Sequence, residues 1–416
     1  MIAGEEWWRL LPPRAPPDAI RILTVRGLRA FADGAVALLL PIYLVELGFS
    51  PLAVGAILTS TLVGSACLTI GVGMVANRYP RRRLLLAACL LMIATGAGFA
   101  LSIELWPILI VAFVGTMNPN SGDVSVFLPL EHTALTQSID SRRRTAFFAR
   151  YSLVGSLLGA IGTLAAAIPD LTADWTGLSP LDAMQMTFGF YGWIGLASFL
   201  IYRRLSPAVE RTADTPPAPL GQSRRIVYRL AALFSIDAFG GGFLVQSILA
   251  LWLYQHFDLS ISVTASILFW SSVCSAASQL VAVPAAERFG LINTMVFTHL
   301  PANVCMMLVP FSPNLEIAIG LLLIRGALSQ MDVPTRSSYV MAVVTPEERP
   351  AAASLTAVPR SFASAAGPLL AGYLLSLSTF GWPLILGGAL KVVYDLLLLA
   401  NFRRVRPPEE VIRRRP

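Results

Sequence analysis

The sequence predicts an all-α membrane protein with 12 transmembrane helices in two six-helix, pseudo-symmetric bundles. Its composition, the lengths of its apolar runs and the placement of its arginines support this fold class. Hydrophobic residues make up 55% of the 416 residues, and charged residues only 13%. A soluble domain is about one quarter charged, so a water-soluble chain of this length would lack polar surface. The mean hydropathy of +0.67 agrees. The expected solvent is therefore lipid.

The apolar runs are long enough to cross a bilayer, because a helix needs about 20 apolar residues to span the hydrocarbon core. Several runs contain proline or glycine, which spans tolerate when neighbouring helices satisfy the backbone. The runs lie at residues 22–46, 52–76, 84–102, 106–135, 145–168, 181–202, 227–254, 261–285, 291–311, 315–343, 353–376 and 382–402.

Arginines mark alternate loops and both tails, whereas the loops between them carry acids and neither Lys nor Arg. Cytoplasmic loops of membrane proteins have this basic excess. We therefore expect an inner (cytoplasmic) cell membrane protein with both termini cytoplasmic. The net charge of +7 could suggest nucleic acid, but these arginines stand in short loops beside apolar runs, so no nucleic-acid partner is expected.

The polar, proline-rich stretch 203–225 is basic at both ends and predicts a cytoplasmic linker. The expected organisation is an N-terminal segment 1–20, a first bundle 21–202, the linker 203–225, a second bundle 226–402 and a tail 403–416. The halves also align with each other. At a shift of 205 residues, Arg144 meets Arg349 and Gly162 meets Gly367. Parallel repeats of six spans are a transporter architecture.

The loop after the second run, "GMVANRYPRRR" (73–83), resembles the signature G-x-x-x-D-R-x-G-R-R of the major facilitator superfamily. Asn77 replaces the acid of the signature, and Pro80 replaces its second glycine. In the family, this loop holds one conformational state through an acid–arginine contact. The residues that match the signature or its second-half copy are Gly73, Arg78, Arg81, Arg82, Glu287 and Arg288.

A second resemblance is to the antiporter helix pattern G-P-x-x-G-G of that superfamily. Its nearest match is Gly367, Pro368, Ala371 and Gly372 in the eleventh run. Small residues at this spacing also let helices pack closely, and ordinary packing is the better-supported explanation of the pattern taken alone.

Ionisable residues within spans predict functional sites, because a charge in hydrocarbon costs about 2.5–3.5 kcal/mol on insertion scales. Arg29 and Asp33 stand four residues apart in the first run. Asp33 is predicted either to carry a proton or to form an ion pair with Arg29. Asp123 in the fourth run is the other candidate proton carrier. Asn118 and Asn120 beside it are expected to line a substrate cavity, or to bond neighbouring helices.

Glu131 and Arg336 occupy matching places in the fourth and tenth runs, 205 residues apart, and we interpret them as a gate pair or as separate interfacial charges. The spacing of Lys391 and Asp395, four residues apart, predicts an ion pair within the twelfth run. Arg325 should bind an anion, which Asp332, a carboxylate of the other half or the substrate could supply. Arg325 is also a cavity candidate, and the remaining ones are Arg29, Asp237, Gln246, Gln330 and Asp332.

No P-loop or G-x-S-x-G motif is present, and the metal-like spacing of cysteines is absent, so an enzyme, a cofactor and a metal site are not expected. The first hypothesis is a monomeric secondary transporter that exports a small molecule against protons by alternating access. Uptake of an organic anion with protons is the alternative. A transporter-like receptor that moves nothing is the third.

Overall fold

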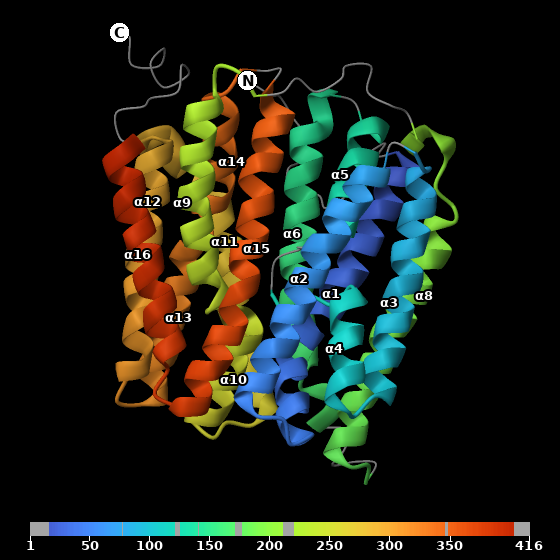
Figure 1. Cartoon of the computed structure of the whole chain (residues 1–416), viewed down its shortest axis with the longest axis vertical. Coiled ribbons are helices and arrows are strands. Elements are labelled where there is room, and N and C mark those ends of the chain that lie inside the picture. Colours follow the sequence, from blue (N-terminus) through green and yellow to red (C-terminus); the bar gives the residue numbers. More distant parts are fainter. Residues whose placement is uncertain are drawn as a thin grey trace. The chain divides into compact units, whose positions relative to one another are not determined.

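The computed structural model describes residues 16–76, 78–120, 125–139, 141–170, 177–210, 220–345 and 348–402. These residues form helices and no strand (Figure 1). The α-helices are α1 (Pro17–Glu46), α2 (Pro51–Val75), α3 (Arg81–Leu101), α4 (Leu105–Val114), α5 (Phe127–Ser138), α6 (Ser141–Ala165), α8 (Pro180–Tyr202), α9 (Arg224–Gly242), α10 (Gln246–His256), α11 (Ile261–Phe289), α12 (Leu291–Leu308), α13 (Leu315–Ser329), α14 (Asp332–Ala342), α15 (Arg349–Leu377) and α16 (Trp382–Phe402). Two short 3-10 helices are η1 (Pro207–Glu210) and η2 (Val309–Phe311).

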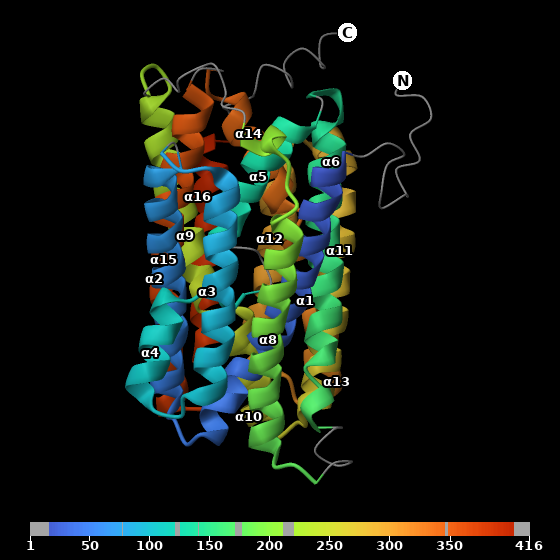
Figure 2. The same ribbon diagram turned by 90° about the vertical axis from the view of Figure 1, so that its right-hand side faces the viewer.

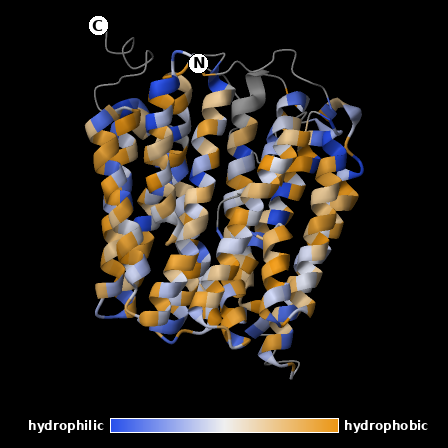
Figure 3. Ribbon diagram, viewed as in Figure 1, coloured by the Kyte–Doolittle hydropathy of each residue, from blue (hydrophilic) through white to orange (hydrophobic). Residues whose placement is uncertain are grey.

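The twelve expected spans are all recognisable. Nine stretches of the described chain are long and apolar enough to cross a membrane. The pair α4 and α5, the pair α13 and α14, and the long helix α15 account for the other three runs. Figure 3 shows the hydrophobic colour along the helices and much of the hydrophilic colour at their ends. This is the distribution that a lipid solvent requires.

Three of the spans are interrupted. α4 and α5 lie at different levels in Figures 1 and 2, and α9 with α10 and α13 with α14 are similarly divided in Figure 1. In the fourth run, the structure has no helix between Val114 and Phe127 among the residues that it describes there. Backbone at these interruptions needs partners from other helices.

The first interruption obtains those partners from α3 and α8. The backbone N–H of Thr116 donates to the Thr95 hydroxyl at 3.2 Å, and the Thr116 hydroxyl lies 3.3 Å from that of Tyr191. The Asn118 side-chain oxygen accepts from the backbone N–H of Asn120 at 3.1 Å. The polar residues predicted for a cavity thus stabilise non-helical backbone.

The chain divides into two compact units. One contains Met1–Gly48, Ser60–Asp214 and Ser260–Ser266, and the other contains Phe49–Thr59, Thr215–Leu259 and Ile267–Pro416. Within the first, α1 packs on α6 and α8, and α3 packs on α8. Within the second, α9 packs on α15 and α16, and α12 packs on α16. The same pairing of helices in the two halves is what an internal repeat produces.

Glycines permit the equivalent crossings α1–α6 and α9–α15. A Cβ on Gly162 of α6 would stand 1.9 Å from the Phe31 carbonyl oxygen, and one on Gly34 of α1 would stand 2.0 Å from that of Gly159. A Cβ on Gly367 of α15 would stand 2.3 Å from the carbonyl carbon of Gly242 in α9. Gly162 and Gly367 are the pair related by the 205-residue shift, so the repeat preserves a backbone contact.

We expect Gly162→Ala to destabilise the protein by roughly 1–3 kcal/mol, the usual range for overpacking, because α1 and α6 must separate. Thermal unfolding in detergent measures the change. Gly320→Ala is the matched control, since no atom lies within 4 Å of its added Cβ and alanine favours a helix interior. Equal unfolding temperatures for the two variants would contradict this view of the crossing.

Candidate functional site

A buried ion pair joins α1 to α5 in the first unit. Arg29 lies in α1 with 1% of its surface exposed, and Glu131 in α5 is fully buried. The Arg29 Nη2 atom lies 3.2 Å from Glu131 Oε1 and 3.4 Å from Oε2. Each charge would be expensive to bury without the other, so the pair fixes these helices together.

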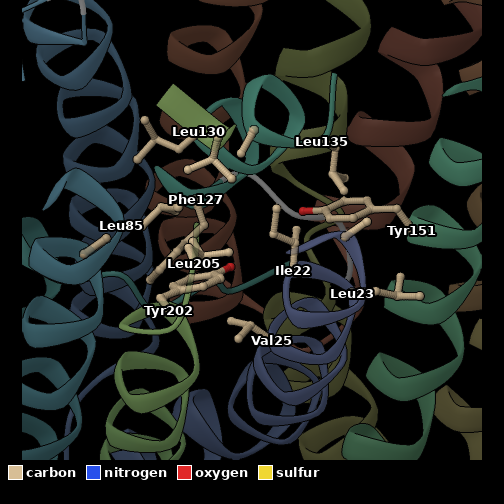
Figure 4. Close-up of a cluster of buried hydrophobic side chains, with 14 of the residues drawn as sticks. Ile22, Leu23, Val25, Leu85, Phe127, Leu130, Leu135, Tyr151, Tyr202 and Leu205 are labelled. Atoms are coloured by element: carbon tan, nitrogen blue, oxygen red, sulfur yellow. The ribbon is translucent and has the colours of Figure 1, made fainter. Parts of the chain in front are cut away.

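Two tyrosines complete the coordination of Glu131. The Tyr202 hydroxyl donates to Oε1 at 2.5 Å, and the Tyr151 hydroxyl donates to Oε2. Arg29 also donates to the Ser125 hydroxyl at 2.9 Å and lies 3.9 Å from the centre of the Phe127 ring. Figure 4 shows Tyr151, Tyr202 and Phe127 with apolar side chains around them. We call Arg29, Glu131, Tyr151, Tyr202 and Ser125 the Arg29 cluster.

A larger charge cluster occupies the second unit, centred on Asp237 of α9. Lys391 of α16 donates to Asp237 Oδ1 at 2.6 Å, and Arg336 Nη1 of α14 lies 3.2 Å from Oδ2. Arg336 also pairs with Asp332 one turn before it. Three helices are thereby joined by ion pairs at a residue that is only 1% exposed.

A histidine extends this cluster into α12. His299 Nδ1 lies 2.9 Å from Asp395 Oδ1, and Nε2 lies 3.8 Å from Asp237 Oδ1. The Asn303 amide donates to Asp395 Oδ2 at 3.2 Å. We call Asp237, Asp332, Arg336, Lys391, His299, Asn303 and Asp395 the Asp237 cluster. All are buried except Lys391, which is partly buried.

The two clusters place opposite charges on equivalent helices. In the first unit the base is on α1 and the acid on α5, whereas in the second the acid is on α9 and the base on α14. Glu131 and Arg336, related by the 205-residue shift, are the residues of α5 and α14 in these pairs. The repeat therefore keeps an ion pair between equivalent helices and reverses its polarity.

The structure corrects one predicted ion pair and excludes one of the partners predicted for Arg325. The predicted pair Lys391–Asp395 is wrong: Lys391 binds Asp237 and Asp395 binds His299, because partners on neighbouring helices approach more closely. Arg325 does not bind Asp332, whose carboxylate pairs with Arg336. Among the described residues, Arg325 has no hydrogen bond or ion pair.

The other candidates lie at the helix interruptions or within α1. Asp33 is 7% exposed and stands one turn beyond Arg29. Gln246 is the buried first residue of α10, and Gln330 follows the last residue of α13. Asp123 lies outside the described residues. Glu131 and Arg336 each have partners in their own unit, and the gate that they were predicted to form stays a prediction.

Sequence reasoning missed His299, Tyr151 and Tyr202. A single histidine in an apolar run has no spacing signal, and tyrosines are common in membrane helices. One local signal was available: Asn303 follows His299 by four residues, so both polar side chains lie on the same face of the helix.

The loop motif after α2 contacts a carboxylate from another part of the first unit. Glu210 of η1 accepts hydrogen bonds from the backbone N–H groups of Arg81 at 2.7 Å and Arg82 at 2.9 Å. The Arg81 side chain donates to the Val209 carbonyl at 2.9 Å. A carboxylate at a helix N-terminus is favoured by the helix dipole. An acid therefore binds the start of α3.

The remaining motif residues are at the surface where the structure describes them. The residues Gly73, Arg78, Glu287 and Arg288 are exposed, and Asn77 lies outside the described residues. In the second unit, a carboxylate that binds backbone N–H groups is that of Glu348, which precedes α15. It accepts from the backbone N–H groups of Gly221 at 2.5 Å and Ser223 at 3.2 Å, near the start of α9.

Comparison with known proteins agrees with the twelve spans and the repeated halves. The family model described as Major Facilitator Superfamily matches residues 22–236 and 230–416. The chain belongs to the major facilitator superfamily. An uncharacterized membrane protein of Saccharomyces cerevisiae is 22% identical over 410 residues, which cover 90% of this chain and 92% of the yeast protein.

Several solved structures with a similar fold are named as those of transporters. The nucleoside transporter NupG has a TM-score of 0.71 at 14% identity, covering 92% of this chain and 99% of that chain. A bacterial homolog of the human lysosomal transporter Spinster has a TM-score of 0.68 at 15% identity, covering 92% and 94%. The human organic anion transporter MFSD10 has a TM-score of 0.62 at 18% identity, covering 91% and 99%. The superfamily member is thus a membrane-embedded, multi-pass protein with the fold predicted from its sequence.

We expect Glu131→Leu to destabilise the protein by about 3–5 kcal/mol, because it leaves the Arg29 guanidinium buried without its carboxylate. The double variant Arg29→Met/Glu131→Leu should recover much of that loss, since neither charge then remains. A double-mutant cycle of unfolding free energies, completed with Arg29→Met, measures the coupling. Simple additivity of the two single changes would show that the ion pair does not stabilise this structure.

Glu348 lies outside the spans, and the Ser223 hydroxyl and the Gly221 N–H hold the pKa of its carboxyl below its ordinary value. A depressed folded-state pKa contributes stability above the unfolded pKa of about 4.3, and this is lost as pH falls through the folded value. We therefore expect wild type to exceed Glu348→Gln in unfolding temperature at neutral pH, with the difference shrinking in acid. A difference independent of pH would argue against an ionised Glu348 in these contacts.

Proposed function

We propose that this protein is a proton-coupled secondary active transporter that exports a small molecule by alternating access. Its carboxylates buried within membrane spans carry the proposal. Asp33 in α1, Glu131 in α5, Asp237 in α9 and Asp395 in α16 are each buried. Ionisable residues inside spans are rare and mark ion pathways and proton relays, because they are costly in hydrocarbon.

Asp33 remains the proposed proton carrier, with Asp123 as the second candidate. Asp33 lies in an unbroken helix, one turn from the guanidinium of Arg29 and in the span that packs on α6 and α8. Loss or gain of its charge alters the electrostatic balance around Arg29 and Glu131. A proton that binds one conformation better than the other shifts the equilibrium between them.

The interrupted spans are the proposed source of substrate contacts. Asn118 follows α4, Gln246 begins α10 and Gln330 follows α13, so each half places amide side chains where a helix is broken. Discontinuous helices expose backbone groups and helix ends, which transporters use to bind substrates and coupling ions. Amides hydrogen-bond as donor and acceptor, which suits a polar organic substrate.

Export is the proposed direction because of the resemblance of Gly367, Pro368, Ala371 and Gly372 to the antiporter pattern. The proposal includes a monomer in the inner membrane with cytoplasmic termini and the gate formed by Glu131 and Arg336.

Uptake of an organic anion with protons is the second candidate. Arg325 favours it, because within the described part of the chain this intramembrane guanidinium has no ionic partner. A substrate carboxylate would supply one. One of the fold neighbours is itself named an organic anion transporter.

The test is flux into or out of proteoliposomes under an imposed pH gradient, with a panel of nucleosides, organic anions and lipophilic cations. We expect movement of a compound opposite to the proton flow, and its gradient-driven accumulation should be lost in Asp33→Asn. Full accumulation by that variant would remove Asp33 as the carrier. Movement in the direction of the protons would favour uptake, and no flux of any compound would favour a non-transporting protein.

A further inference from the structure

His299 places one titratable ring between two carboxylates of the Asp237 cluster. It lies in α12 and is 4% exposed. Its Nδ1 atom is 2.9 Å from Asp395 Oδ1, and its Nε2 atom is 3.8 Å from Asp237 Oδ1. The imidazole therefore faces α16 with one nitrogen and α9 with the other.

The contact with Asp395 determines where a proton would bind. An ionised carboxylate only accepts hydrogen bonds, so we assign the hydrogen of the neutral imidazole to Nδ1, which donates it to Asp395. The Asn303 amide nitrogen, 3.1 Å from Nδ1, then donates to Asp395 Oδ2. The lone pair of Nε2 then points toward Asp237. When the ring takes up a proton, the new N–H forms on Nε2 and faces the Asp237 carboxylate.

Asp237 already has two cationic partners when the imidazole is neutral. Lys391 lies 2.6 Å from Oδ1 and Arg336 lies 3.2 Å from Oδ2. The imidazolium would approach the same Oδ1 atom that binds Lys391. Protonation of His299 therefore sets a third cation in competition for the carboxylate that joins α9, α14 and α16.

The formal charges around His299 balance while its ring is neutral. Three carboxylates in the surrounding helices face three fixed cations. The carboxylates are Asp237, Asp332 and Asp395, and the cations are Arg336, Lys391 and Arg360, whose charge interacts with Asp237 and Arg336. The Tyr394 ring centre lies 6.1 Å from that of His299. α13 packs on α12 and carries Arg325, for which the described residues provide no ionic contact. A proton on His299 thus adds one positive charge to these six balanced groups.

We propose that His299 is a proton-binding residue of the second half, and that its protonation weakens the ties of Lys391 and Arg336 to Asp237. The inference rests on the proposed proton coupling and adds a site distinct from Asp33. Binding of a proton at α12 is converted into a change of ion pairing among α9, α14 and α16. Asp395 acts as the positioning residue, since it fixes the tautomer, and Asn303 holds Asp395.

The residue counts of this chain allow a direct test without a known substrate. The sequence contains three histidines and one lysine, Lys391. Histidine and lysine labelled with 15N in the full chain, reconstituted in lipid, give at most three imidazole environments and one ammonium signal. The variant His299→Gln assigns the His299 signals by their loss.

We expect the His299 imidazole signals and the Lys391 ammonium shift to change together as the pH is varied, with one common midpoint. In His299→Gln the Lys391 shift should be constant over the same pH series. In Asp395→Asn the common midpoint should differ from that of wild type, because the carboxylate that faces Nδ1 is lost. His132→Gln is the control, because that ring contacts Phe148 and Tyr151 in the other half and should leave the Lys391 response unchanged.

An imidazole that stays neutral throughout, or a Lys391 signal that ignores its titration, would overturn the inference. The outcome of the flux experiment is independent of the outcome of this titration. Wild type without proton-driven flux would refute the proposed coupling while leaving the His299–Lys391 titration measurable. Proton-driven flux that survives unchanged in His299→Gln would confirm the coupling and refute this site.

Discussion

The expense of ionised side chains in hydrocarbon is the constraint on which this structure depends. Arg29 and Glu131 are both almost inaccessible. The carboxylate oxygens of Glu131 and the two terminal nitrogens of Arg29 have partners from the first half. Asp237 is satisfied in the same manner from α14 and α16. Such pairs add little stability compared with apolar packing, but the loss of one member is severe. The clusters therefore specify which helices adjoin more than they strengthen the bundle.

The backbone obeys the same rule as the side chains. α4 ends before α5 begins, and the buried backbone N–H of Thr116 between them donates to the Thr95 hydroxyl of α3. Helix ends of the first half receive carboxylates instead, with Glu210 on the start of α3. Glu348 does this for the residues before α9 in the second half. Irregular backbone thus occurs where a specific polar group can meet it.

Most of the fold follows from sequence because its signals are local and one-dimensional. These signals are the length of an apolar run, the arginines at a loop border and the glycines at a helix crossing. Each can be recognised within one helix or by comparing the two repeats. Asn118 and Asn120 were singled out for the same reason, as polar residues inside the fourth apolar run. These features need no knowledge of which helix neighbours which.

The partners within the clusters were harder to foresee, since they depend on helix rotation. Lys391 and Asp395 satisfy the spacing for a pair, yet each points to another helix. Glu131 was recognised as an intramembrane acid, but its contacts with Tyr151 and Tyr202 required the packing of α6 and α8 against α5. His299 gave no periodic pattern at all. Spacing along one helix limits the possible partners and does not choose among them.

The reversed polarity of the two ion pairs bears on how repeats are detected. Equivalent positions 131 and 336 hold an acid and a base, which any similarity score would count as a mismatch. Their shared property is that each is one pole of an interhelical dipole. Two halves could instead be compared by the charge of the residue that each position contacts. Such a comparison would detect a repeat even where the residues at equivalent positions differ in charge.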